Sequence, residues 1–564
     1  MPFVGGIVLV DEGKSMEEAR KGSKKVIAAI VIVVILIIVA LAVVFMTGIT
    51  GGQKTAVFYM ATHVLSLDPM DAYDTASFIP IHNIYDTLVG YPGEDIDEYV
   101  GVLATSWTVS PNGLYYNFTL RRDVKFSNGN PFTAEDVKFS VDRVLQMDSP
   151  DTGVAWILSQ DVNETSVTVI DDYNVSFRLT FPYAGFLATI AQPFPLGIMD
   201  KENTTEHYSD ADPYAHDYRK YHPLGTGPYM LESWEEETRT VLVKNPHYWK
   251  GWEGNHLDKI VIKEVEDVNT KVQALKSGDA TIAEIPFGNI PDVQNDPNIV
   301  IDPVATFQLE MIAMNTDEER AGHEFMKNAT VRRAFSFAFD YANTSLNFYA
   351  GYMDPVQGCI PNGMPLETES QPSKAFTFDL RMASQLLNES GYTLDSQNER
   401  FNGTAIEIYV DSGDTERAQT ASLFKTNLNR LGINVNLQQV TSSVLEGKRT
   451  GDDWDMYMTG WVIDYLDPDD YVLPIAASRH VSGGDYFNTG VNISAVDDAT
   501  MDAAETSDPE DRAALYKIVW ENLNEDPNMI FVGQTRYVCF YRANLQGFMF
   551  NAVTWYNFYY YWLT

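Results

Sequence analysis

The sequence contains only two cysteines, Cys359 and Cys539, among its 564 residues. A disulfide-dense scaffold and a Cys/His metal site of the zinc-finger type are therefore excluded, although the two thiols could form one disulfide. Basic residues are also scarce, with 39 Lys and Arg against 78 Asp and Glu and a formal net charge of −39. Because nucleic-acid binding needs a basic surface, this charge argues against a nucleic-acid partner.

Sequence patterns typical of enzymes are absent as well. The chain has no GxSxG elbow, no HExxH, no CxxC and no GxxxxGK[ST] phosphate loop, and its nine histidines never occur at i, i+4 spacing. We therefore expect no catalytic residues, no cofactor and no metal site. A surface enzyme such as a peptidase stays open as an alternative. An adhesive surface protein is a second one, although internal repeats and sandwich-like strand spacing are missing.

One long apolar run is present, the uncharged residues 26–46, VIAAIVIVVILIIVALAVVFM. It is long enough to span a hydrocarbon layer of about 30 Å and longer than the core of a cleaved signal peptide. No cysteine directly follows it, which excludes a lipoprotein-type anchor. The flank directly before it carries four basic residues, Arg20, Lys21, Lys24 and Lys25, and positive charge stays on the cytoplasmic side.

These features predict a single-pass protein of the cell membrane. Residues 1–25 form a cytoplasmic tail, 26–46 a transmembrane anchor, 47–54 a linker, and 55–564 an extracytoplasmic domain. Nine N-x-[ST] sequons follow the anchor and none precedes it, which fits an exported and glycosylated chain or an unmodified surface rich in Asn, Ser and Thr. They begin at Asn117, Asn163, Asn174, Asn203, Asn328, Asn343, Asn388, Asn402 and Asn492.

The rest of the chain alternates between strand-like and helix-like segments. Residues 115–120 and 166–179 are rich in β-branched and aromatic residues and predict strands. Thr133 can cap a helix whose first turn carries two acids, and 332–340 and 511–523 have the pattern of amphipathic helices. At this length, a mixed α/β chain with more than one domain follows.

Four segments, in this order, carry a family pattern. They are LATSWTVSPNGLYYNFTLRRDVKFSNGNPFTAEDVKFSVDR at 103–143, GTGPYMLESWEEETRTVLVKNPHYW at 225–249, VRRA at 331–334 with Asp340, and GWVIDYLDPDDY at 460–471. Together they resemble family 5 of the extracytoplasmic solute-binding proteins of ABC transporters, which includes the oligopeptide- and dipeptide-binding proteins. The likeness extends from about residue 55 to 564.

The resemblance implies an α/β, three-lobed periplasmic-binding-protein-like fold of the class II, oligopeptide-binding type, here with an N-terminal transmembrane helix. The ligand would lie between two lobes that close by a hinge motion, and the closed form would dock on the permease. The implied bounds are 55–90, 225–310 and 526–564 for lobe I, 91–224 for lobe II and 311–525 for lobe III.

Asp464 is the candidate ligand-binding residue. The sequence from Asp467 to Asp470 has the pattern of a helix start, which accounts for three carboxylates without a ligand. Asp464 instead has apolar and aromatic neighbours and needs a partner, because an unpaired buried carboxylate is costly. By resemblance it receives the α-ammonium of a peptide. A salt bridge to a protein Arg or Lys is the alternative.

Two further residues complete the predicted site. Trp461 would form a wall of the cleft, or else pack in the core. Arg417 is the candidate partner of a ligand carboxylate, because it lies in roughly the region where dipeptide-binding members of the family carry such a cation.

The function expected from the resemblance is capture of peptides and their delivery to a permease. The partners would be a peptide, the transmembrane permease subunits with their ATPases behind them, and the membrane through the N-terminal helix. Members of the family also bind nickel complexes, haem or oligosaccharides, and these stay open as ligands.

Overall fold

The structure of the protein, a computed structural model, describes residues 53–147, 154–317, 323–356, 358–370, 376–451, 453–481 and 483–564. Thr55 to Thr564 form one compact unit. The predicted tail and anchor, and all of the linker up to residue 52, lie outside the described residues, so the anchor stays a prediction. Within the described ranges, no helix is both long and apolar enough to cross a membrane.

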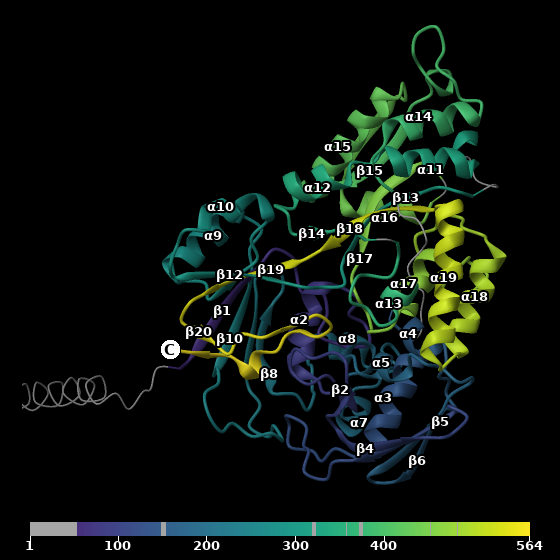
Figure 1. Ribbon diagram of the computed structural model, residues 1–564. Coiled ribbons are helices and arrows are strands. Elements are labelled where there is room, and N and C mark those ends of the chain that lie inside the picture. Colours follow the sequence, from purple (N-terminus) through teal and green to yellow (C-terminus); the bar gives the residue numbers. More distant parts are fainter. Residues whose placement is uncertain are drawn as a thin grey trace, which may run out of the picture. The chain divides into compact units, whose positions relative to one another are not determined.

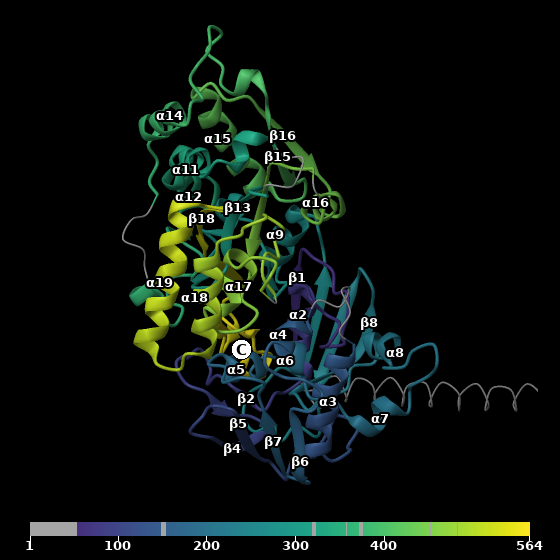
Figure 2. The same cartoon turned by 90° about the vertical axis from the view of Figure 1, so that its right-hand side faces the viewer.

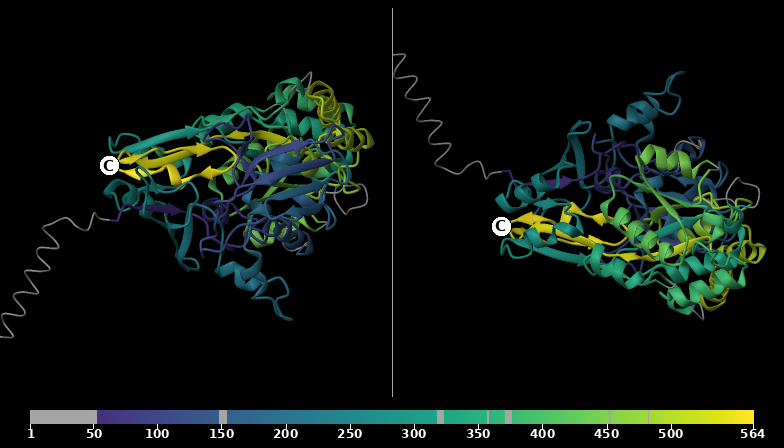
Figure 3. Two further views of the ribbon diagram at one scale, coloured as in Figure 1. Left: turned by 90° about the horizontal axis from the view of Figure 1, so that it is seen from below. Right: turned by 90° about the horizontal axis from the view of Figure 1, so that it is seen from above.

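A seven-stranded sheet combines strands from widely separated parts of the chain. β1 pairs in parallel with β10 and β11, while the C-terminal β19 pairs antiparallel with β11 and β12. Figure 3 shows this yellow C-terminal stretch running beside teal strands of the same sheet. The strand order is β12 (Ile299–Val304), β19 (Tyr537–Arg542), β11 (Ile282–Ala283), β1 (Thr55–Met60), β10 (Lys259–Glu264), β9 (Arg239–Lys244) and β8 (Tyr229–Glu235).

A four-stranded antiparallel sheet contains the two strand segments expected from the sequence. Its order is β4 (Ala104–Val109), β5 (Tyr115–Leu120), β7 (Asn174–Arg178) and β6 (Val167–Asp171), so that 166–179 forms a hairpin. Helix α3 (Ala134–Gln146) packs on β6 and β7, and Thr133 precedes it as predicted, with its backbone N–H donating to Asp136 Oδ2. The buried residues of this sheet share one apolar core with one face of the seven-stranded sheet, whereas other buried residues of the seven-stranded sheet, such as Tyr59 and Phe540, pack in a separate core.

A six-stranded sheet carries helices on both faces. Its order is β14 (Met353–Asp354), β18 (Met529–Thr535), β13 (Leu309–Met314), β17 (Met456–Trp461), β15 (Ile406–Asp411) and β16 (Val435–Val440). Successive residues of a strand point to opposite faces, so β13 sends Ile312 into one core and Met311 into another. The first core includes α11 (Ala329–Ala338), α14 (Leu380–Glu389) and α15 (Thr415–Arg430).

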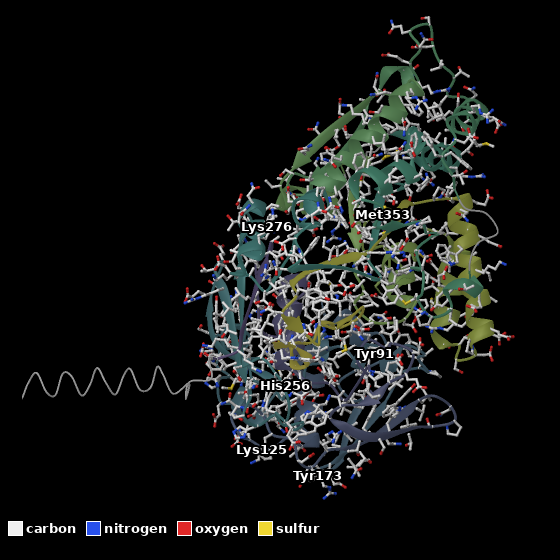
Figure 4. The ribbon with its side chains drawn as sticks, turned by 60° about the vertical axis from the view of Figure 1, so that its left-hand side comes forward. Tyr91, Lys125, Tyr173, His256, Lys276 and Met353 are labelled. Carbon is white, nitrogen blue, oxygen red and sulfur yellow. The ribbon has the colours of Figure 1, made fainter. Side chains whose placement is uncertain are left out.

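The second core includes three helices that follow β17 in the sequence. They are α17 (Asp469–Ala476), α18 (Ser494–Glu505) and α19 (Pro509–Glu525). Figures 1 and 2 show α18 and α19 side by side, and Figure 4 labels Met353 in β14 of this sheet and Tyr173 in the β6–β7 hairpin. Helices α11 and α19 cover the two helical segments that the sequence predicts.

The remaining elements are short or connect the sheets. The helices are α2 (Thr75–Ile84), α4 (Trp156–Ser159), α5 (Phe186–Ile190), α6 (Pro193–Leu196), α7 (Lys201–Thr205), α8 (His216–Tyr221), α9 (Val268–Ser277), α10 (Ile290–Val293), α12 (Tyr341–Phe348), α13 (Glu367–Ser370) and α16 (Ser442–Arg449). The two-residue strands are β2 (Val89–Gly90), β3 (Val100–Gly101), β20 (Leu545–Gln546), β21 (Phe550–Asn551), β22 (Trp555–Tyr556) and β23 (Trp562–Leu563).

One boundary differs from the sequence expectation. The resemblance implies that 526–564 belong to lobe I, but β18 pairs with β13 and β14 in the six-stranded sheet. Only β19, which begins after the single residue Arg536, enters the seven-stranded sheet. The two strands follow each other almost without a turn, so no loop in the sequence marks the change of sheet. The two cysteines are both buried and free, and the possible disulfide is not formed.

Close backbone contact explains the glycines of the GTGP segment. A Cβ on Gly225 would lie 2.1 Å from the carbonyl oxygen of Ile84, and one on Gly227 would lie 2.7 Å from it. The Gly227 N–H donates to this same oxygen at 2.9 Å. Only glycine allows the chain to pass this close to the end of α2, where it enters β8.

Candidate functional site

Strand β17 and the segment after it position two of the predicted site residues, Trp461 and Asp464. The strand lies between β13 and β15, ends at Trp461, and is followed by Asp464 and then α17 (Figure 1). A Cβ on Gly460 would lie 2.4 Å from Arg417 Nη2 and 2.7 Å from the Leu309 carbonyl oxygen. The glycine of the GW pair is therefore required by the packing of Arg417 and of β13 against β17.

Asp464 is buried and receives a hydrogen bond from a distant part of the chain. Its exposed fraction is 5%, and the Tyr73 hydroxyl donates to its Oδ2 at 2.6 Å. No ion pair joins Asp464 to any Lys, Arg or His of the described ranges, so the protein salt bridge considered above is not formed there. Burial raises the pKa of Asp464 to about 7, and the hydrogen bond from Tyr73 opposes this rise.

A second carboxylate lies directly behind Asp464. Asp470 is fully buried; its Oδ2 accepts the backbone N–H of Asp464 at 3.0 Å, and its Oδ1 accepts the Trp461 indole N–H at 3.4 Å. Burial first, and then the charge of Asp464, raise the pKa of Asp470 well above its usual value. The pair thus shares less than two full negative charges at neutral pH.

The other two acids of the segment do have a cation. Arg512 of α19 donates to Asp467 Oδ1 at 2.6 Å and to Asp469 Oδ2 at 3.3 Å, while the Tyr516 hydroxyl donates to Asp469 Oδ1 at 2.5 Å. Asp467 Oδ1 also accepts the Asp469 N–H, as expected at a helix start. The helix-start interpretation was incomplete, however, because Asp469 and Asp470 are buried with specific partners and do not face solvent.

Trp461 packs among aromatic rings. Its ring lies edge-on to Tyr486 and to Phe487, with centroids 5.2 and 5.6 Å apart, and 7% of the residue is exposed. Its indole N–H is held by Asp470. Trp461 therefore contributes to the core around β17 and links the two carboxylates to an aromatic cluster.

Arg417, at the start of α15, has partners within the protein. Its Nε donates to Glu310 Oε2 at 2.7 Å and lies 3.4 Å from Asp414 Oδ2. Glu310 is buried, with an exposed fraction of 3%. The two carboxylates raise the pKa of Arg417 above its ordinary value. A ligand carboxylate at Arg417 would have to compete with this pair.

A cation that the sequence analysis missed contacts Tyr486, a ring that packs on Trp461. The Arg449 guanidinium lies 4.3 Å from the centroid of the Tyr486 ring and donates to the Tyr486 carbonyl oxygen. It also pairs with Glu446, whose side chain is 56% exposed. Arg449 is the last residue of α16, and basic residues are common at the ends of helices because they interact favourably with the helix dipole. Its position in the sequence therefore does not indicate a role in ligand binding.

Tyr465 carries the site into contact with a different part of the protein. It is fully buried in an apolar cluster with Phe78, Ile157, Ala188 and Phe194. Hydrogen bonds at 3.4 and 3.5 Å join its hydroxyl to Tyr183 and Gln160. The segment after β17 therefore contacts α2, α4, α5 and α6, which all precede the six-stranded sheet in the chain.

The arrangement suits binding of a cationic group more than catalysis. Asp464 combines an ionisable carboxylate, aromatic neighbours and a location where several parts of the chain meet. The described residues include no set of three or more His, Cys, Asp or Glu positioned to hold a metal ion.

A family comparison decides the class of protein. Residues 98–483, more than half of the chain, match the model of the bacterial extracellular solute-binding proteins, family 5. The chain belongs to this family. The resemblance identified from the four sequence segments is thereby confirmed, and the protein is an extracytoplasmic solute-binding component of an ABC transport system.

Known members of the family cover nearly the whole chain. The glutathione-binding protein GsiB of Salmonella choleraesuis is 27% identical over 518 residues, which are 90% of this chain and 94% of that protein. The periplasmic binding protein DppA of Helicobacter pylori, solved with the peptide STSA, is 25% identical with a TM-score of 0.77 and covers 91% of this chain and 98% of its own.

A third protein shares the fold alone. NikA of Brucella suis, solved with Fe(III)-EDTA, is 24% identical with a TM-score of 0.77 and covers 91% of this chain and all of its own. The expected periplasmic-binding-protein fold is confirmed by both structures. This solute-binding protein therefore has relatives whose ligands differ in chemistry.

Proposed function

We propose that this family 5 solute-binding protein captures peptides and that Asp464 receives their N-terminal ammonium. The observation that carries the proposal is a carboxylate that is 5% exposed and hydrogen-bonded to a neutral Tyr73, with no cation paired to it in the described part of the chain. A buried carboxylate without a cation is costly, and a ligand ammonium removes that cost. The peptide bound to the Helicobacter relative supports this ligand class.

The other two predicted residues take unequal parts in this proposal. Trp461 supports the site through Asp470 and Tyr486. Arg417 stays a predicted carboxylate partner, but its pairing with Glu310 makes Arg449 the better candidate, because the partner of Arg449 is largely exposed. We assign no catalytic step to the protein.

The proposal includes the way in which the protein works in the membrane. Residues 26–46 anchor it, lobes I and III close around the peptide that lies between them, and the closed form delivers the peptide to the permease. The N-terminal sequence of the mature protein tests the anchor, because a chain that begins after residue 46 would contradict it. Protease protection of 1–25 in sealed, right-side-out vesicles tests the orientation.

The test of the ligand site is a cycle of two proteins and two ligands. The tetrapeptide Ser-Thr-Ser-Ala and its N-acetylated form are titrated calorimetrically into wild type and Asp464→Asn. The free peptide should lose at least about tenfold in affinity with Asp464→Asn, because truncating one partner of a buried charge pair costs about 2–5 kcal/mol. The acetylated peptide should bind both proteins weakly and equally.

A matched control separates the site from the overall charge. Asp354→Asn removes a carboxylate that pairs with Arg536 at the surface, and it should leave both titrations unchanged. Native mass spectrometry of the purified full-length protein identifies any ligand that co-purifies. A nickel complex, haem or an oligosaccharide there, or equal binding of both peptides to both proteins, would overturn the peptide assignment.

A further inference from the structure

Tyr73 connects three separate parts of the chain through one hydroxyl. It lies just before α2, and its hydroxyl donates to Asp464 Oδ2 at 2.6 Å across 391 residues of sequence. The indole N–H of Trp156, at the start of α4, donates to the same hydroxyl at 3.3 Å. Tyr73 lies in the region of the seven-stranded sheet, Asp464 in that of the six-stranded sheet and Trp156 in that of the four-stranded sheet.

The chemistry of the three groups fixes the direction of this chain of hydrogen bonds. An indole N–H can only donate and an ionised carboxylate can only accept, so the one hydroxyl hydrogen of Tyr73 must point to Asp464. This uses Oδ2 of Asp464. Within the described part of the chain, no hydrogen bond is made to Oδ1.

We propose that Tyr73 is a positioning residue for Asp464, the carboxylate that binds the ligand. Held by Trp156, its hydroxyl fixes Asp464 through Oδ2, favours the ionised form and leaves Oδ1 to the ligand's ammonium. Because the hydroxyl and the indole belong to different parts of the chain, they hold Asp464 in this position only when those parts are together. This inference rests on the proposed role of Asp464 in ligand binding.

The electrostatic surroundings give the proposal a measurable consequence. The groups that face Asp464 are Tyr73 from the segment before α2, Asp470 and Tyr471 from α17, and Tyr486 from the loop beyond it. Tyr73 is the group among these whose hydrogen bond lowers the pKa of Asp464 against burial. Without that hydroxyl the carboxyl should hold its proton to higher pH.

The first measurement needs no ligand. In the full-length protein, ¹³C-labelled aspartate carboxyls are titrated by NMR, with the Asp464 signal assigned from its loss in Asp464→Asn. Tyr73→Phe should move the titration of Asp464 to higher pH, and Trp156→Phe should move it in the same direction by less. The matched control is Tyr516→Phe, which removes another hydroxyl bonded to a buried aspartate, Asp469, and should leave Asp464 unmoved.

The second measurement uses Ser-Thr-Ser-Ala and its N-acetylated form between pH 5.5 and 7.5. Tyr73→Phe should weaken binding of the free peptide by about tenfold at pH 6.5 and shift the acid limb of its affinity profile upward, since a hydrogen bond to a charged group is lost. The acetylated peptide should show neither change.

The outcomes separate this inference from the function on which it rests. An Asp464 titration that stays in place in both Tyr73→Phe and Trp156→Phe overturns the positioning role, whatever the affinities are. If the titration moves while neither peptide distinguishes the variants, Tyr73 positions Asp464 as inferred, but the ammonium site is refuted. If Tyr73→Phe does not fold, Trp156→Phe alone decides the first measurement.

Discussion

Two pairs of buried carboxylates lie within seven residues of each other, and they are stabilised in opposite ways. Asp467 and Asp469 share the guanidinium of Arg512. Asp464 and Asp470 have a hydroxyl, an indole N–H and a backbone N–H, and no cation pairs with them in the described ranges. The first pair is neutralised within the protein and links α17 to α19, whereas our proposal assigns the cation of the second pair to the ligand.

The largest effect is expected from breaking the complete pair. Arg512→Met removes the cation but keeps most of the apolar side chain, and it leaves two buried acids without a partner. We expect the free energy of unfolding to fall by about 3–5 kcal/mol, as for other buried ion pairs that lose one partner. Urea denaturation at pH 7 measures this. If Arg512→Met costs no more than Asp464→Asn, the two pairs do not differ as described.

The incomplete pair should respond to pH in the opposite sense from a salt-bridged acid. The pKa of Asp464 is about 7 in the folded protein and about 3.9 in an unfolded chain, so the folded state holds the proton more tightly. Its contribution to stability is full below pH 4 and is lost as pH rises through 7.

Asp464→Asn removes this titration. Relative to wild type, the stability of the variant should therefore increase by up to about 4 kcal/mol between pH 4 and pH 8 in the absence of ligand. Urea denaturation of both proteins across this range gives the difference. A difference that is constant with pH, or that falls as pH rises, would show that Asp464 is ionised and fully compensated in the folded protein.

A smaller effect separates the local carboxylate from the charge of the whole chain. A net charge of −39 attracts cationic ligands over a distance and repels anionic ones, and salt screens both effects. At low ionic strength, a Lys-containing tetrapeptide should associate severalfold faster than a matched Glu-containing one, and the rates should converge with added salt. Stopped-flow measurements test this.

Asp464→Asn provides the sharper version of that experiment. It removes one charge of many, so the difference in association rate should persist while the dissociation rate increases. Equal association rates of the two peptides at low salt would remove the role of overall charge. Loss of the rate difference in Asp464→Asn would instead place the steering at the site itself.

The sequence predicts local structure and a carboxylate without a nearby partner, Asp464, but not the contacts that this residue makes. The 166–179 hairpin, the helices around 332–340 and 511–523, and the isolation of Asp464 among apolar neighbours all depend on short-range patterns. Tyr73 and Trp156 are neutral aromatic residues far from Asp464 in sequence, and in a chain with many tyrosines nothing distinguishes them. Such contacts exist only once the sheets are placed together.

The same limit applies to the partners of the acids. Two acids at a helix start are adequately explained by the helix dipole, so no sequence pattern indicates that Arg512 pairs with Asp467 and Asp469. The prediction that Arg417 binds a ligand carboxylate depends on its position in the sequence. In the structure Arg417 pairs with Glu310 of β13. A cation's availability depends on its neighbours in space, which residue spacing does not reveal.

The smallest effect is expected from Asp470→Asn. Burial and the charge of Asp464 raise the pKa of Asp470 well above its usual value, which favours the protonated form of this carboxyl. An amide has the same shape and the same lack of charge as a protonated carboxyl. It keeps one oxygen to accept the N–H of Asp464 or of Trp461.

We therefore expect Asp470→Asn to change stability by less than about 1 kcal/mol and peptide affinity by less than about threefold at pH 7, against at least about tenfold for Asp464→Asn. Denaturation and calorimetry on the two variants in parallel measure both quantities. An affinity loss in Asp470→Asn equal to that in Asp464→Asn would mean that the negative charge resides on Asp470, or on both acids together. The ligand's ammonium would then be drawn to the pair as a unit, and Tyr73 would owe its position to a shared proton instead of to a single ionised carboxylate.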